Sequence, residues 1–156
     1  MKMKTKKHIC LFFISIVAVG GLTATATANE THDNSAVRMD CMIRELVNMT
    51  EMEVLDEVAT RATGSISSEV PANKTAVSGK QFPLEIGETV TINCSYSPAF
   101  ASMDFGVIAP DGYFYFSNVT GGSINKSMVV SQRGNYAVAI RNNSSYSVRV
   151  VGFVEY

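Results

Sequence analysis

Apolar and polar side chains alternate along the chain from Lys80 to Tyr156, as they do in strands with one buried face. Glycine, proline and asparagine interrupt the alternation about every ten residues, as turns do. The strands expected from this pattern are 82–86, 90–96, 103–107, 113–116, 124–130, 136–140 and 148–156. So many short strands predict a mainly β fold, a small antiparallel β-sandwich of about seven strands over residues 80–156.

Residues 29–61 form an acidic segment with a different period. A polar tail, 29–35, precedes apolar residues that recur every three or four positions from Ala36 to about Arg61, which predicts an amphipathic helix. This helix either contacts a partner through its methionine-rich face or lies loosely on the sandwich. The face consists of Met39, Met42, Leu46, Met49 and Met52. The small and hydroxyl side chains of residues 62–79 then predict a linker, with room for one short edge strand.

The first 28 residues have the composition of a signal peptide. Four lysines lie in the first seven residues, and the apolar run 9–19 is shorter than the roughly 20 residues that span a bilayer. Ala26-Thr27-Ala28 fits a cleavage site. We therefore expect a secreted or cell-surface protein that meets the membrane only through this segment, before cleavage after Ala28.

Charge excludes some partners. Without residues 1–28 the chain keeps nine basic and fourteen acidic side chains, a net charge of −5. Nucleic acids and anionic membranes attract basic surfaces, so we expect neither as a partner.

The sequence offers few groups for catalysis. His32, in the polar tail, is the only histidine after the signal segment, so Ser-His-Asp and Cys-His arrangements are not expected in the sandwich. We therefore predict no enzyme and no cofactor. Asp104 and Asp111 leave open a small hydrolase that uses paired carboxylates, although a sandwich of this size offers little cleft. Together with Asn118 they could instead hold calcium, while Asp111 also suits a turn.

Two groups of side chains are candidates for ligand contact. The run Tyr113-Phe114-Tyr115-Phe116 places two rings on each face of a strand, and Tyr113 and Tyr115 are predicted to lie outside. They would contact a ligand or only stabilise the sheet. Arg141 and Arg149 flank the turn 142–145 and would lie near each other, either solvated or facing an acidic partner, which the segment 36–61 could supply.

Cys41 and Cys94 remain after cleavage of the signal segment. Export would allow a disulfide between them. The alternative is that Cys94, on the apolar side of its strand, is a small core residue.

Two motifs carry a resemblance. Two stretches, Val107-Ile108-Ala109-Pro110-Asp111-Gly112 and Gly134-Asn135-Tyr136-Ala137-Val138-Ala139-Ile140-Arg141-Asn142-Asn143-Ser144-Ser145, resemble the end of jelly-roll sandwiches of the bacterial pre-peptidase C-terminal and GOLD types. The layout is also similar to small exported proteins of Gram-positive bacteria. The resemblance implies a jelly-roll-like fold and a non-catalytic binding or accessory role, and it implies no site residues. Together with the signal segment, the sandwich pattern and the missing catalytic groups, it leads us to expect a module that binds a protein or glycan at or outside the cell surface. A secreted effector or inhibitor that acts through the 36–61 helix is the alternative.

Overall fold

The computed structural model describes residues 36–39, 42–46, 52–55, 57–60 and 63–156. They belong to one compact unit, Asn34–Tyr156. The predicted signal segment 1–28 lies outside the described residues. Among those described, no helix has the length and apolarity to span a membrane.

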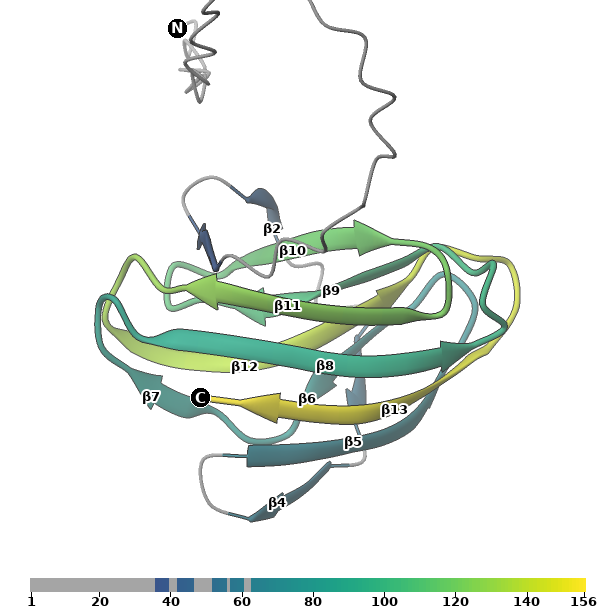
Figure 1. The fold of residues 1–156 in the computed structure, drawn as a ribbon, viewed down its shortest axis with the longest axis horizontal. Helices are drawn as coiled ribbons and strands as arrows, with labels where there is room; N and C mark the ends of the chain where they lie inside the picture. Colours follow the sequence, from purple (N-terminus) through teal and green to yellow (C-terminus); the bar gives the residue numbers. More distant parts are fainter. Residues whose placement is uncertain (1–35, 40–41, 47–51, 56, 61–62) are drawn as a thin grey trace, which may run out of the picture. The chain divides into compact units, whose positions relative to one another are not determined.

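Two sheets face each other (Figure 1). The six-stranded sheet runs in the order β1 (Val37–Arg38), β11 (Ser123–Val129), β8 (Thr89–Ser97), β13 (Val148–Glu155), β5 (Thr63–Val70) and β4 (Glu57–Thr60). The seven-stranded sheet runs in the order β2 (Ile43–Leu46), β10 (Tyr113–Val119), β9 (Met103–Ile108), β12 (Gly134–Asn142), β6 (Thr75–Ser78) and β3 (Met52–Leu55), with β7 (Phe82–Leu84) paired to β12. The β1–β11 and β3–β6 pairs are parallel, and the other pairs are antiparallel.

The chain crosses repeatedly between the sheets. It does so from β8 to β9, β10 to β11, β11 to β12 and β12 to β13. Four connections lie together at one end of the sandwich, on the right in Figure 1: residues 71–74, 98–102, 120–122 and 143–147.

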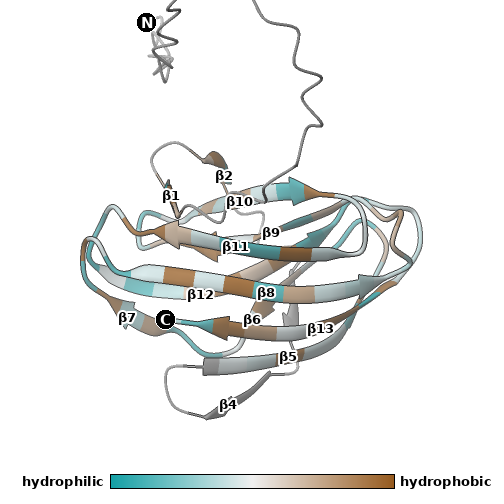
Figure 2. Ribbon diagram, viewed as in Figure 1, coloured by the Kyte–Doolittle hydropathy of each residue, from teal (hydrophilic) through white to brown (hydrophobic). Residues whose placement is uncertain are grey.

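The core lies between the sheets and follows the strand alternation. Along β8 every second residue from Val90 to Tyr96 is buried and the residues between them are at least partly exposed. Figure 2 shows the same alternation of apolar and polar residues along the β8 ribbon. Phe105 and Tyr136 from the opposite sheet are fully buried against this face. The pattern predicts this packing because a strand with one buried face removes every second side chain from water.

The mainly β prediction is confirmed. Each of the seven strands expected after Lys80 corresponds to one of β7 to β13, with bounds that differ by a few residues.

Two predictions before Lys80 are wrong where the structure describes the chain. The described parts of the expected helix, 36–61, include strands β1 to β4 at sheet edges rather than one continuous helix, because pairing with β11, β10, β6 and β5 satisfies their backbone groups. The expected linker, 62–79, holds β5 and β6. Strand β5 lies between β13 and β4 and contributes Ile66 and Val70 to the core.

Candidate functional site

Asn142 holds together the connections at one end of the sandwich. We call this end the loop end; it consists of residues 71–74, 98–102, 120–122 and 143–147. The Asn142 side chain is completely buried at the end of β12. Its Nδ2 lies 3.0 Å from the carbonyl oxygen of Val70, 3.1 Å from that of Pro71 and 2.7 Å from that of Tyr146. One amide group therefore ties the 71–74 loop to the 143–147 loop.

Further hydrogen bonds join the loops to each other. The Ser102 N–H donates to Ser144 Oγ at 3.1 Å, and the Asn143 N–H donates to the Ser102 carbonyl at 3.0 Å. The Gly121 N–H donates to the carbonyl of Ala99 at 2.8 Å. Gly122 adopts φ +89°, and a Cβ there would lie 2.8 Å from Ala99 Cβ, so only glycine allows this approach.

Phe100 and Tyr146 project from this scaffold. The Phe100 side chain is 76% exposed and that of Tyr146 is 36% exposed. Their ring centroids are 5.7 Å apart with an interplanar angle of 63°, an edge-to-face pair. Because the loops beneath are hydrogen-bonded, the structure holds two aromatic rings in water on an ordered base, which makes the loop end the strongest candidate for a binding surface.

Sequence reasoning missed both rings. A signal was present: Phe100 follows Pro98, which ends a strand, and Tyr146 lies among asparagine and serine residues. An aromatic residue between turn residues has no place in the buried face of a strand. Only the structure brings the two loops together.

The tyrosines expected outside face the interior. Tyr115 is 3% exposed and belongs to the core, and Tyr113 is half-buried against it. The prediction that they lie outside is wrong, because β10 pairs with β9 in a register that places Tyr115 opposite the buried Val107.

The Tyr115 hydroxyl reaches polar partners at the surface of the sandwich. It donates to Asp111 Oδ2 at 2.6 Å and accepts from Arg44 Nη1 at 3.2 Å. Burial and the bond to Asp111 raise the pKa of Tyr115. Burial opposes ionisation of Asp111, but hydrogen bonds from Tyr115, Gln132 and the Tyr113 N–H, with the charge of Arg44, bring the pKa of Asp111 below its ordinary value. Asp111 therefore has the turn role that its sequence context indicated.

The outward pair is instead Phe114 and Phe116, which stack at 4.9 Å on the outer face of the seven-stranded sheet. The guanidinium of Arg141 lies over them, 4.7 Å from the Phe116 centroid and 5.7 Å from that of Phe114. Both rings are at most 5% exposed. They are a covered apolar cluster rather than an open platform.

Asp104 and Asn118 lie together, but Asp111 does not join them. Asn118 Nδ2 donates to Asp104 Oδ1 at 2.6 Å, and Arg141 Nε and Nη2 contact Asp104 Oδ2 at 2.8 and 2.7 Å. Asp111 lies in the turn beyond the far end of β9 and bonds Tyr115. The structure therefore brings together neither the calcium set nor the carboxylate pair. The described residues contain no group of three or more His, Cys, Asp or Glu placed to hold a metal ion.

Arg141 and Arg149 lie in opposite sheets, on β12 and β13. The expectation that they are near each other is wrong, because the turn between them carries the chain across the sandwich. The expected acidic neighbour is present for Arg141, whose Nη1 lies 2.5 Å from Glu45 Oε2 on β2. Arg149 is exposed on the other sheet.

The methionine-rich face does not form one surface. Met39 is fully buried in the core, Met42 packs against the core and Leu46 is 70% exposed. Met49 and the side chain of Met52 lie outside what the structure describes. Cys94 is a free, buried thiol, as the core interpretation predicted, and Cys41 lies outside the described residues.

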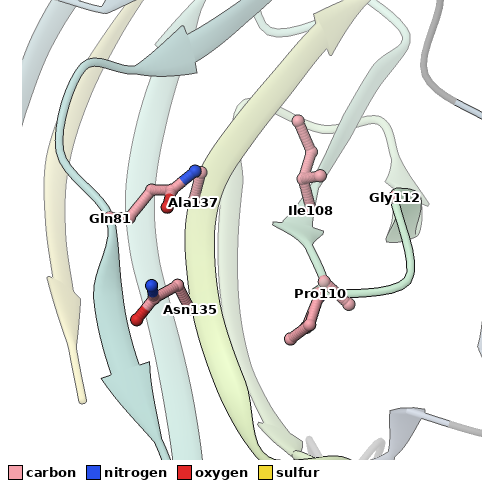
Figure 3. A pocket seen from close by; sticks show the side chains of 7 residues that line it. Gln81, Ile108, Pro110, Gly112, Asn135 and Ala137 are labelled. Carbon is pink, nitrogen blue, oxygen red and sulfur yellow. The ribbon is translucent and has the colours of Figure 1, made fainter.

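A shallow pocket of about 420 Å³ lies at the opposite end of the sandwich, beside the turn between β9 and β10 (Figure 3). The amides of Gln81 and Asn135 line one side, and Ile108 and Pro110 lie on the other. Ala109, Gly112 and Ala137 complete the lining. Its small polar groups are uncharged, so it offers no acid or base for chemistry.

Comparisons with known proteins give distant similarities only. No protein-family model matches the chain, and no curated protein matches its sequence. Among solved structures, it is similar to the Aeromonas hydrophila periplasmic lysozyme inhibitor PliG, an inhibitor of g-type lysozyme. The identity is 14% over 67% of this chain and 96% of that one, with a TM-score of 0.49.

It is also similar to the carbohydrate-binding module CBM36, solved with calcium and xylotriose. Here the identity is 14% over 65% of this chain and 92% of that one, with a TM-score of 0.35. Similarities this distant assign neither function nor binding residues. The resemblance to pre-peptidase C-terminal and GOLD domains stays a prediction.

Proposed function

We propose that the chain is an exported, non-catalytic recognition domain that contacts a protein partner outside the cell through Phe100 and Tyr146. The exposure of Phe100 carries the proposal. A phenylalanine that is 76% exposed leaves apolar surface in water that a partner can cover. Complete burial of such a side chain contributes about 1.5–3 kcal/mol. That equals roughly a 10- to 100-fold change in the dissociation constant.

The scaffold supports a binding role. Asn142, Ser102 and Ser144 fix the loops in the free protein, so little loop ordering would be needed on association. The two rings stand at 63° and form a projecting edge-to-face pair rather than a flat platform. A projecting aromatic side chain fits a pocket in a protein surface, where aromatic anchors contribute most of the binding energy.

The other functions have weaker support. An effector that acts through residues 36–61 would need their methionines on the surface, and Met39 is in the core. A hydrolase would need Asp104 and Asp111 in one cleft, and both oxygens of Asp104 already have partners within the protein.

Site-specific photo-crosslinking tests the proposal. The photoreactive residue benzoylphenylalanine would replace Phe100 in one protein and Ile86 in a matched control. Ile86 is 70% exposed at the other end of the sandwich. Each protein is incubated with the intact producing cells and with their secreted proteins before irradiation. A protein adduct specific to position 100 is expected. Equal adducts at both positions, or none at position 100, would contradict the proposal.

A substitution then measures the contribution of the rings. Phe100→Ser with Tyr146→Ser should weaken binding of the cross-linked partner at least tenfold, while Ile86→Ser should leave it unchanged. Circular dichroism and thermal unfolding establish that all three proteins fold alike.

A further inference from the structure

The centre of the outer face of the six-stranded sheet consists of short hydroxyl and amide side chains around two apolar ones. Strands β11, β8, β13 and β5 lie side by side in the foreground of Figure 2, and their outward side chains form cross-strand rows. One row consists of Ser123, Ser95, Val151 and Ser67, and the next of Asn125, Asn93, Phe153 and Ser65. We name these two rows the hydroxyl–amide platform.

The platform carries no charged residue. Charged side chains border it instead: Arg149 and Glu69 lie opposite each other beyond the Val151 row, and Glu155 lies beyond the Phe153 row. Solvent-exposed faces of soluble domains ordinarily hold charges of both signs. Short hydroxyl and amide groups occupy the positions where lysine and glutamate would be expected.

Two apolar side chains lie at the middle of this surface. Val151 is 41% exposed and Phe153 is 37% exposed, both on β13, which has paired strands on either side. Hydroxyl and amide groups of β8 and β5 flank them in register. An open aromatic face bordered by uncharged donors and acceptors complements a sugar ring, which has an apolar face and a rim of hydroxyls.

We propose that the hydroxyl–amide platform binds a neutral polysaccharide, with Phe153 against a sugar ring and Asn93, Ser95 and Asn125 as hydrogen-bond partners. The platform itself has no cationic group for an acidic glycan, and of the three charges at its border the only basic one, Arg149, lies opposite Glu69, while Glu155 is acidic. This arrangement favours a neutral chain over an acidic one. This surface is separate from the loop end and would serve a second ligand.

Affinity electrophoresis of the full chain under native conditions tests the proposal. The gels contain hydroxyethylcellulose, arabinoxylan, galactomannan or dextran as neutral polysaccharides, and alginate as the acidic one. We expect at least one neutral polysaccharide to slow the protein, and alginate to leave it unaffected. No retardation in any neutral gel, or stronger retardation in alginate, would overturn the proposal.

Two variants locate the contact. Phe153→Thr removes the ring and introduces a β-branched residue suited to a strand, and Ser95→Glu places a charge at an exposed platform position. Each should reduce the retardation at least fivefold, and unchanged retardation in either would overturn the assignment. Thermal unfolding shows whether each variant is folded.

Phe100→Ser separates the two binding surfaces. It should leave polysaccharide retardation unchanged while it weakens binding of the protein partner. Phe153→Thr should reduce polysaccharide retardation and leave binding of the protein partner unchanged. Loss of retardation in Phe100→Ser would place the glycan at the loop end and reject the platform.

Discussion

Asp104 is a buried carboxylate that needs both a counter-charge and hydrogen-bond partners. It is 1% exposed on the outer face of the seven-stranded sheet, and both its oxygens are occupied, one by Asn118 and the other by Arg141. A buried carboxylate is costly unless it is paired and hydrogen-bonded. Arg141 therefore compensates this charge, covers the rings of Phe114 and Phe116, and ties Glu45 of β2 to the sheet.

Removal of Arg141 should reveal that dependence. Arg141→Met is expected to lower the free energy of unfolding by about 2–4 kcal/mol, because Asp104 stays buried without its counter-charge. Urea denaturation followed by circular dichroism measures the loss. Arg149→Met, on the exposed face of the other sheet, is the control and should change stability by less than about 0.5 kcal/mol.

A second substitution separates charge from packing. Adding Asp104→Asn to Arg141→Met removes the uncompensated charge and should restore part of the lost stability. If the double variant is less stable than Arg141→Met alone, the compensation argument fails.

Cys94 allows a chemical test at the same scale. Burial raises the pKa of its thiol to about 12. At pH 8 the folded protein should therefore resist alkylation at Cys94 by iodoacetamide, which attacks the thiolate. In denaturant, alkylation should be rapid. Peptide mapping by mass spectrometry reads this position separately from Cys41.

The same pKa fixes a pH dependence. The folded state favours the neutral thiol, so this contribution to stability is present below the ordinary pKa of 9.0 and is lost as the pH rises toward about 12. Cys94→Ala should remove that part of the alkaline loss. If alkylation of Cys94 by iodoacetamide required a reductant as well as denaturant, Cys94 would be in a disulfide bond.

At the scale of elements, the loop end depends on contacts between connections rather than on any one of them. Asn142→Ala leaves the carbonyls of Val70, Pro71 and Tyr146 without their donor. We expect a loss of about 2–4 kcal/mol, since each buried group left unsatisfied costs about 1–3 kcal/mol. Asn143→Ala, at the exposed neighbouring position, should have little effect.

Hydrogen exchange distinguishes a loosened loop end from a weaker core. In Asn142→Ala, the amides of residues 99–102 and 143–147 should exchange faster than in the Asn143→Ala control, while those of β8 and β9 stay protected. Uniform acceleration across the sandwich would show that Asn142 stabilises the whole fold instead of its loops.

The elements differ in how far the sequence predicted them. Strands β7 to β13 were predictable because each combines alternation with turn residues at its ends. Strand β5, with the sequence TGSISSEV, offers only Ile66 and Val70 as apolar residues, and it is a strand because β13 and β4 pair with it on both sides. Pairing between distant segments leaves little trace in a local pattern.

The same limit explains the site. Met39 and Met42 fit a helical stripe, but the core takes Met39 from an edge segment, and no periodicity distinguishes these outcomes. Tyr113 and Tyr115 alternate with Phe114 and Phe116, so either pair could have faced inward. The bond from its hydroxyl to Asp111 allows Tyr115 to be buried. Phe100 and Tyr146 are 46 positions apart and meet only through the fold.

At the scale of the whole molecule, the compact unit begins well before the alternating segment. It starts at Asn34, and residues before Lys80 fill places inside the sandwich. Met39, Ile66 and Val70 are at most 3% exposed, and β5 covers one side of β13 along its whole length. A fragment that starts at Lys80 would expose that side of β13 and lose these three core side chains.

Successive truncations should therefore lower stability in order. Relative to residues 34–156, the fragment 63–156 loses Met39, whose removal is expected to cost about 2–5 kcal/mol. The fragment 80–156 also loses Ile66 and Val70, at about 1.5–3 kcal/mol each, together with the pairing of β5 and β6. Domains of this size have only about 5–15 kcal/mol in total, so we expect 80–156 to show no cooperative urea transition. A cooperative transition in 80–156 at the same midpoint as in 34–156 would mean that strands β1 to β6 add nothing to the stability of the sandwich.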